Sequence, residues 1–350
     1  MTSMEMLALD VLLIASLLAL TIATLAAPDA RRSVLLFIAF GLVLAVVWGR
    51  LLAPDVALAE AAIGAGLTGA LLLAALREQP RQVTAELQRS VNRRRPGLRL
   101  ALEWVVTLFS FLIAALLAWS LTLAFERGPQ DALAQSIGDK LAVSGVSNPV
   151  TAVLLNFRAY DTLLELAVLL TAVLGILMLG PARPGYRTAG PVYAGLTRWL
   201  VPVLILTGGY LLWVGAHAPG GAFQAGATLA AAGVVLRLAG QPVAGLTRYG
   251  GTLRVMIAAG VGVFLLTGLG LLLLGRPFLG YPPALAGSLI LLIETAAMLA
   301  IAATLVLAFI GGRPQPAGPA VITNTRGKPA ASDNVTSPLQ DHAVNGKTSC

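Results

Sequence analysis

Five carboxyl side chains stand within long apolar stretches of the sequence, where water cannot solvate them. They are Asp10, Glu60, Asp161, Glu165 and Glu294. A charged side chain near the centre of a membrane-spanning helix costs roughly 2.5–3.5 kcal/mol on insertion scales. Each of them must therefore face protein or water, or be neutral, and a carboxyl group that can be neutral can hold or pass a proton. The five residues are candidates for an ion or proton path.

The alternative for each carboxyl is a structural hydrogen bond to a neighbouring helix or subunit. Asp161 and Glu165 are four residues apart, which places them on one face of a helix. Arg158 lies one turn before Asp161 and could pair with it, and Asp161 also fits the position of a helix N-cap. Glu294 stands about ten residues into its stretch and is the most deeply placed of the set.

A short polar turn separates two of the later apolar stretches. A proline and adjacent glycines break a helix sharply, and glycines allow the backbone to approach other groups closely. Spacing alone favours a tight re-entrant turn. The turn residues are Pro219, Gly220, Gly221, Phe223 and Gln224. His217, just before them, could relay protons at physiological pH or be a solvated capping residue.

The elements that must position these residues follow from composition. Of 350 residues, 57% are hydrophobic and 11% charged, whereas soluble domains carry about 25% charged residues. This excludes a soluble enzyme, a nucleic-acid-binding domain and a disordered protein. The single cysteine, Cys350, and two distant histidines argue against a metal or iron–sulfur site. We expect no cofactor and no nucleic-acid partner.

About 20 apolar residues are needed to cross the hydrocarbon core, and nine stretches of the sequence are candidates. The sequence therefore predicts an all-α, polytopic membrane protein with about nine transmembrane helices. The seventh stretch is short and rich in small residues. The predicted spans are Met6–Ala26, Ser33–Trp48, Val56–Leu76, Ala101–Ala124, Thr162–Leu179, Trp199–Ala216, Ala222–Leu236, Val255–Leu274 and Leu285–Ile310.

The positive charges orient these spans. Cytoplasmic loops carry an excess of Lys and Arg. With the N-terminus outside and the C-terminus cytoplasmic, every internal segment is basic, and the net charge of +8 is a topology signal. The external segments then hold only Arg50, Arg127, Lys140, Arg158 and Arg276 of the 24 basic residues.

The spans fall into groups of three, two and four. The predicted modules are 1–78 with three helices, 101–185 with two helices and an external loop, and 186–311 with four helices. A basic cytoplasmic linker, 79–100, follows the first module, and a disordered cytoplasmic tail, 312–350, ends the chain. Within the external loop, Gln130–Lys140 is a candidate short interfacial helix.

Three local patterns in this order resemble one family. Residues 53–66 (APDVALAEAAIGAG) resemble the three-span module of the MbhD protein of membrane-bound hydrogenases. Residues 150–165 (VTAVLLNFRAYDTLLE) are similar to the two-span MbhE protein of the same complexes. Residues 219–226 (PGGAFQAG), with four spans around them, resemble MnhB, a component of Mrp-type Na⁺/H⁺ antiporters.

The resemblance implies a fused, non-motor subunit of an Mrp-like monovalent cation (Na⁺)/proton antiporter in a prokaryotic cell membrane, and not an enzyme. Implied partners are large ion-pumping A- and D-like subunits, small C-, E-, F- and G-like subunits, and the lipid bilayer. By motif, Glu60, Asp161 and Glu165 match the family's acidic positions, and Glu294 stands where the last span of MnhB-type proteins carries an acid.

Three alternatives stay open at this point. The chain could be a membrane-arm subunit of a membrane-bound hydrogenase or another complex-I-related respiratory complex. It could be a purely structural adaptor in such an assembly. A stand-alone transporter would need activity from this chain by itself.

Overall fold

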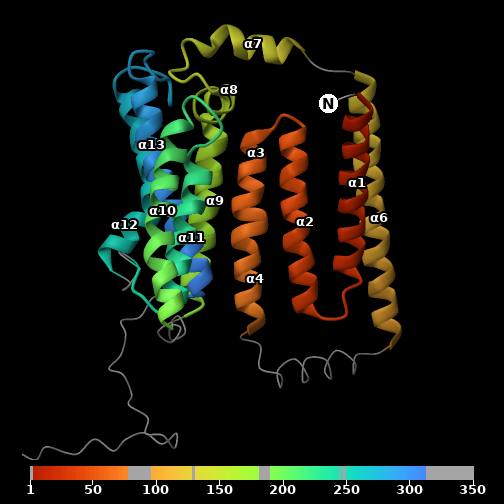
Figure 1. The fold of residues 1–350 in the computed structure, drawn as a ribbon. Coiled ribbons are helices and arrows are strands. Elements are labelled where there is room, and N and C mark those ends of the chain that lie inside the picture. The colour runs from red at the N-terminus through yellow and green to blue at the C-terminus, as the bar shows by residue number, and fades with distance from the viewer. Residues whose placement is uncertain are drawn as a thin grey trace, which may run out of the picture. The chain divides into compact units, whose positions relative to one another are not determined.

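A computed structural model describes residues 3–77, 96–127, 131–180, 190–243, 246 and 250–312 (Figure 1). Within these ranges all regular elements are helices. The first part holds α1 (Ser3–Leu25), α2 (Ala30–Arg50), α3 (Pro54–Ala59), the π-helix η1 (Glu60–Leu67), α4 (Thr68–Arg77) and α6 (Pro96–Arg127). Next come α7 (Asp131–Leu141), α8 (Pro149–Ala152), the π-helix η2 (Val153–Phe157) and α9 (Ala159–Met178). The last group is α10 (Pro191–Val214), α11 (Ala222–Leu238), α12 (Gly251–Leu273) and α13 (Ala286–Ile310).

Each of the nine predicted apolar stretches is helical. Eight of these helices are long and apolar enough to cross a membrane, and α11, with 17 residues, is a shorter apolar helix. The all-helical, polytopic prediction is confirmed, and the chain is a multi-pass membrane protein. Helix α10 begins at Pro191 rather than near Trp199, and the predicted loop helix is α7. Most of the predicted linker and nearly all of the predicted tail lie outside the described residues.

The described residues include two π-helical segments, in which each turn holds one extra residue: one lies within the third span and the other just before the fifth. The third span runs from α3 through η1 into α4, and η1 begins at Glu60. The second π-helix, η2, joins α8 to a break at Arg158 before α9. Threonines satisfy carbonyls in both: Thr68 Oγ1 donates to Ile63 O at 2.7 Å and Thr162 Oγ1 to Leu154 O at 2.6 Å.

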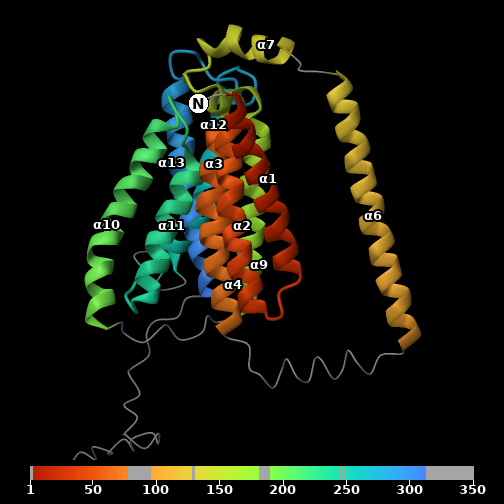
Figure 2. The same cartoon turned by 45° about the vertical axis from the view of Figure 1, so that its right-hand side comes forward.

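Helix α13 is at the centre of the packing. It contacts α9, α10, α11 and α12, and these helices lie side by side in both views (Figures 1 and 2). Its inward face is apolar, with Ile293 and Leu307 fully buried. Alanines such as Ala297 and Ala303 on the same helix allow close helix–helix approach. The one carboxyl of this helix, Glu294, therefore stands among closely packed apolar side chains.

The first helices form a second set of contacts. Helix α2 packs against α1, α3, η1 and α4. Helices α3 and η1 also contact α11, and α4 contacts α13. These contacts bring residues near position 55 beside residues near position 220. By contrast, the apolar windows of α1 and α6 have no buried residues.

Candidate functional site

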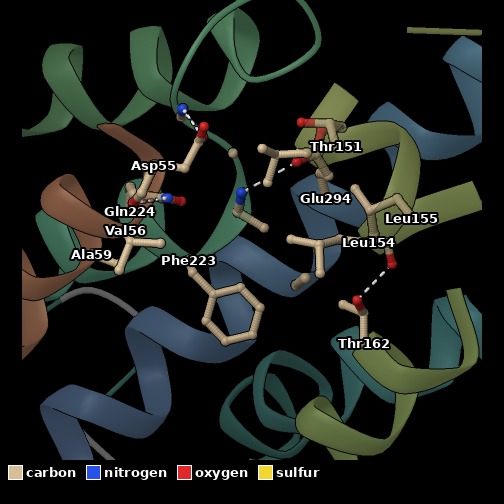
Figure 3. Close-up of a pocket in the computed structure, with 15 residues that line it drawn as sticks. Asp55, Val56, Ala59, Thr151, Leu154, Leu155, Thr162, Phe223, Gln224 and Glu294 are labelled. Carbon is tan, nitrogen blue, oxygen red and sulfur yellow. Dashed lines mark hydrogen bonds between the residues drawn. The ribbon is translucent and has the colours of Figure 1, made fainter. Parts of the chain in front are cut away.

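Three consecutive backbone amides in the turn between α10 and α11 each donate to a different helix, and Figure 3 shows the bonds to Asp55 and Glu294. Gly220 N–H donates to the Asp55 carboxylate of α3, at 3.1 Å. Gly221 N–H donates to Leu211 O at the end of α10, at 2.9 Å. Ala222 N–H donates to Glu294 Oε1 of α13, at 3.3 Å. The turn is thus held by three helices at once.

Glycine is required at position 221 for two reasons. Its φ is +106°, in the region that side chains disfavour. A Cβ at this position would lie 2.9 Å from Glu294 Oε1. Because α11 begins at Ala222, Glu294 lies at the positive end of a helix, where free amides favour a negative charge. The turn predicted from the sequence therefore binds a carboxyl group through its backbone.

A pocket of about 240 Å³ opens beside this turn. Glu294 is only 2% exposed, and Glu294 and Asp55 are the titratable residues that line the pocket. Apolar side chains form most of the rest of its wall. They include Val56, Leu154, Leu155 and Phe223, which Figure 3 shows around the two carboxyl groups. A carboxyl in such a site can bind a proton or a desolvated cation.

The start of α8 holds the other side of the turn. Thr151 Oγ1 donates to Gly215 O at 2.6 Å, and Asn148 Nδ2 donates to Ala218 O at 3.0 Å. The backbone amides of Ser147 and Asn148 both donate to Ala216 O. These bonds satisfy the carbonyls that the break at the end of α10 leaves free. These bonds attach the α8 side of the turn to the end of α10.

Glu60 has its own space, separate from the residues that line this pocket. Its carboxyl group lies against the backbone of Gly64, one π-turn further along η1. A Cβ on Gly64 would come within 2.7 Å of the Glu60 Cδ, and a Cβ on Gly41 of α2 would lie 3.2 Å from its Oε1. Two glycines on two helices therefore leave a notch for the carboxyl.

Asp161 and Glu165 lie on the outer side of α9. Asp161 forms the expected ion pair with Arg158, at 2.5 Å; the Arg158 side chain is largely exposed and the Asp161 side chain is about half exposed. Glu165 is also exposed, although it stands seven residues into a membrane-spanning helix. Neither residue lines the pocket. The structure thus places these two carboxyls on a surface and Glu294 in the interior.

Asp10 forms a two-point ion pair between α1 and α2. Arg50 Nε donates to one carboxylate oxygen at 2.9 Å and Nη2 to the other at 3.2 Å. A bidentate pair of this kind has good geometry. It gives Asp10 a structural partner that no local sequence pattern indicates.

His217 is exposed and does not line the pocket. Its Nδ1 lies 3.0 Å from Ser147 Oγ, and its ring meets Trp213 edge-on, with centroids 6.0 Å apart. Pro219 does not line the pocket either, whereas the other predicted turn residues do: Gly220, Gly221, Phe223 and Gln224.

Asp55 is a site residue that the sequence patterns did not indicate. It stands in the segment 53–66 that carried the MbhD resemblance, directly after Pro54 at the start of α3. A carboxylate in the first turn of a helix has an ordinary explanation through the helix dipole. Its partner Gly220 is 165 positions away in the sequence, so no local signal could pair them. Among the described residues, no three His, Cys, Asp or Glu side chains gather as metal ligands.

The fold and the site together define a multi-pass helical membrane protein with a buried carboxyl at a helix break. Comparison with known proteins specifies the modules. Residues 15–81 match the family model MbhD, which describes one of the MBH proteins. Residues 192–312 match the model described as "Domain related to MnhB subunit of Na+/H+ antiporter". The chain contains an MbhD-like module followed by an MnhB-like module, as the motifs predicted.

A solved structure shares this fold. It is titled "Structure of Mrp complex from Dietzia sp. DQ12-45-1b", with a TM-score of 0.65 and 22% identity. The match covers 88% of the present chain and 35% of the matched chain, so the present chain spans about a third of that chain's length. No protein with a curated description matches. The resemblance of residues 150–165 to MbhE stays a prediction.

Proposed function

We propose that this chain is a membrane subunit of an Mrp-type antiporter, which exchanges a monovalent cation such as Na⁺ for protons across a prokaryotic cell membrane. One observation carries the proposal. The buried Glu294 carboxyl lies at the N-terminus of α11, inside the segment that matches an antiporter-subunit model. Proton exchange at desolvated carboxyls, in competition with cation binding, is the mechanism that this geometry supports.

The exposed residues support a role as a subunit rather than a complete transporter. Glu165 is exposed within a span, which would cost roughly 2.5–3.5 kcal/mol against lipid. The apolar windows of α1 and α6 have no buried residues. We therefore infer that other membrane subunits, of the large ion-pumping and small types, cover part of this surface. The chain alone should show no transport in proteoliposomes.

Glu294, Glu60 and Glu165 are the residues that we assign to the ion or proton path, with Asp161 at its edge. Glu294 is central because it combines burial, a helix N-terminus and a pocket. Asp10 has the weakest claim of the five, because Arg50 already neutralises it.

Transport in inverted vesicles that contain the whole complex tests the assignment. Addition of Na⁺ should dissipate a respiration-generated pH gradient, followed with a fluorescent weak base. Glu294→Gln should lower this rate at least about tenfold, which corresponds to about 1.4 kcal/mol. Asp139→Asn, an exposed carboxyl on α7, is the matched control and should leave the rate unchanged. If Glu294→Gln and Glu165→Gln assemble normally and transport like wild type, the chain is a structural adaptor.

A second candidate is a membrane-arm subunit of a membrane-bound hydrogenase or a related respiratory complex, because the first module matches the MbhD model. Purification of the native complex in mild detergent separates the two. We expect large antiporter-type subunits to co-purify. Co-purification of nickel–iron and iron–sulfur subunits would instead show that the chain belongs to a redox-driven complex and not to an antiporter.

A further inference from the structure

We propose that Asp55 is a positioning residue: it holds the α10–α11 turn so that the Ala222 amide points at Glu294, and thereby links the ionisation of Glu294 to the MbhD-like module. This inference deepens the proposed function and rests on it for the role of Glu294. Neither the family matches nor the motif resemblance assigns a role to Asp55.

The contact between Asp55 and the turn is a clamp with two points. The side chain accepts from Gly220 N–H at 3.1 Å, and the main-chain carbonyl of the same residue accepts from Gln224 Nε2, also at 3.1 Å. Gln224 is 8% exposed and stands in the first turn of α11. Pro54 precedes Asp55 and occupies the first turn of α3, where its fixed φ favours the start of a helix. The clamp therefore joins two helix starts from two modules.

A short stretch of backbone connects the clamp to the amide that donates to Glu294. Gly220, which Asp55 holds, and Ala222, which donates to Glu294, are separated only by Gly221. Gly221 itself donates to Leu211 O, so the direction of all three amides is set together. A glycine at the centre, with φ +106°, gives the turn no side chain of its own to stabilise it. Removal of one acceptor should let the adjacent amides reorient.

The consequence is an energetic coupling between two sites. An amide that donates to a carboxylate stabilises its ionised form. If the Asp55 clamp aligns the Ala222 amide, then proton or cation binding at Glu294 must also alter the strength of the α3–α11 contact, because such coupling is reciprocal. Among the residues that line the pocket, Asp55 is the titratable one besides Glu294. Charge and positioning must therefore be separated by experiment.

A pair of substitutions at Asp55 achieves this separation. Asp55→Asn removes the negative charge but keeps an oxygen that accepts from Gly220 N–H, whereas Asp55→Ala removes both. A purely electrostatic effect of Asp55 on Glu294 is the same in the two variants. A positioning effect appears only in Asp55→Ala. Gln224→Leu removes the second bond of the clamp and leaves the charge of Asp55 in place.

The experiment labels the purified complex with a hydrophobic carbodiimide, which reacts with protonated carboxyl groups, and measures Glu294 modification by mass spectrometry over a series of pH values. We expect the pH midpoint of labelling to lie higher in Asp55→Ala than in Asp55→Asn by about one unit, a tenfold change in proton affinity. The pH midpoint of Glu294 labelling in Gln224→Leu should also lie above that of the wild type. Asp29→Asn, at the exposed N-cap of α2, should not shift.

Equal midpoints in Asp55→Ala and Asp55→Asn, together with an unshifted Gln224→Leu, would overturn the proposal. If Asp55→Ala does not assemble, Gln224→Leu decides by itself, since it changes no charge. The labelling does not depend on transport. A complex without Na⁺-linked proton movement would therefore refute the proposed function, while the midpoints would still show whether Asp55 positions the turn.

Discussion

At the residue scale, the carboxyl groups within the spans have acquired different surroundings. Glu294 is buried beside helix amides, Glu60 lies in a notch of two glycines, and Glu165 is exposed on α9. The sequence predicted each as a candidate for the same reason, since an acid stands in an apolar stretch. It placed Glu294 deepest of the set, but it could not predict the contacts of each carboxyl, because burial and partners depend on other helices.

Gly64 is a direct test of the notch around Glu60. Gly64→Ala places a methyl group where the Glu60 carboxyl now lies. The carboxyl is the end of a flexible side chain, so it should move aside with little loss of stability. We expect cation-driven proton transport in vesicles to fall to the level of Glu60→Gln, with normal assembly. Gly262→Ala in α12, where a Cβ meets no atom within 4 Å, is the control. Unchanged transport in Gly64→Ala would show that the position of the Glu60 carboxyl is unimportant.

The Asp10–Arg50 pair is a test of structural stabilisation. Both side chains are partly exposed, at 41% and 32%, and the bond is bidentate. A double-mutant cycle with Asp10→Asn and Arg50→Gln should give a coupling energy of about 0.5–3 kcal/mol in the stability of the complex. Thermal inactivation of the purified complex measures it. A coupling energy near zero would mean that the pair contributes nothing to the stability of the complex. The ion pair would then be no argument against a role of Asp10 in the ion path.

At the element scale, the existence of the helices was predictable and their internal breaks were not. Apolar stretches mark spans because water-free surroundings require every backbone group to bond within the helix. The predicted start of α10, near Trp199, was too late, because Tyr193, Thr197 and Arg198 lower the hydropathy of its first turns. The hydropathy of the sequence cannot reveal the π-helices η1 and η2, because a π-helical turn differs from an α-helical turn in geometry and not in composition. Both lie beside residues of the site, where such segments are frequent.

Thr162 tests whether the break at η2 is held by its side chain. Thr162→Val keeps the shape but removes the donor to Leu154 O. A partly buried carbonyl left without its partner costs about 1–3 kcal/mol. We therefore expect a lower thermal midpoint for the purified complex. Thr171→Val on the same helix, an exposed residue whose hydroxyl bonds within α9, should change stability by less than about 0.5 kcal/mol. Equal changes of the thermal midpoint in the two variants would show that the Thr162 hydrogen bond at the break after η2 stabilises the protein no more than an ordinary bond within a helix.

At the scale of the whole molecule, the contact between α3 and the α10–α11 turn joins the two matched modules. The order of these two modules was predictable from their motifs. Their contact was not, because it rests on Asp55 and Gly220, which are 165 residues apart. The number of membrane crossings also belongs to this scale. Eight helices meet the length of a span, while α11 has 17 residues and rises about 26 Å against a hydrocarbon core of about 30 Å.

The sides on which the two ends of the chain lie decide whether α11 crosses. Nine crossings would place the ends on opposite sides, and the distribution of Lys and Arg predicts that the C-terminus lies inside. Cys350 is the single cysteine, so a membrane-impermeant maleimide reports on the C-terminal side without further engineering. We expect labelling in inverted vesicles and none in intact right-side-out vesicles. Thr2→Cys in a Cys350→Ser background should show the reverse pattern. Labelling of both positions from the same side would mean eight crossings, with α11 and its turn entering the membrane without traversing it, and Glu294 would then face a pocket open to one side only.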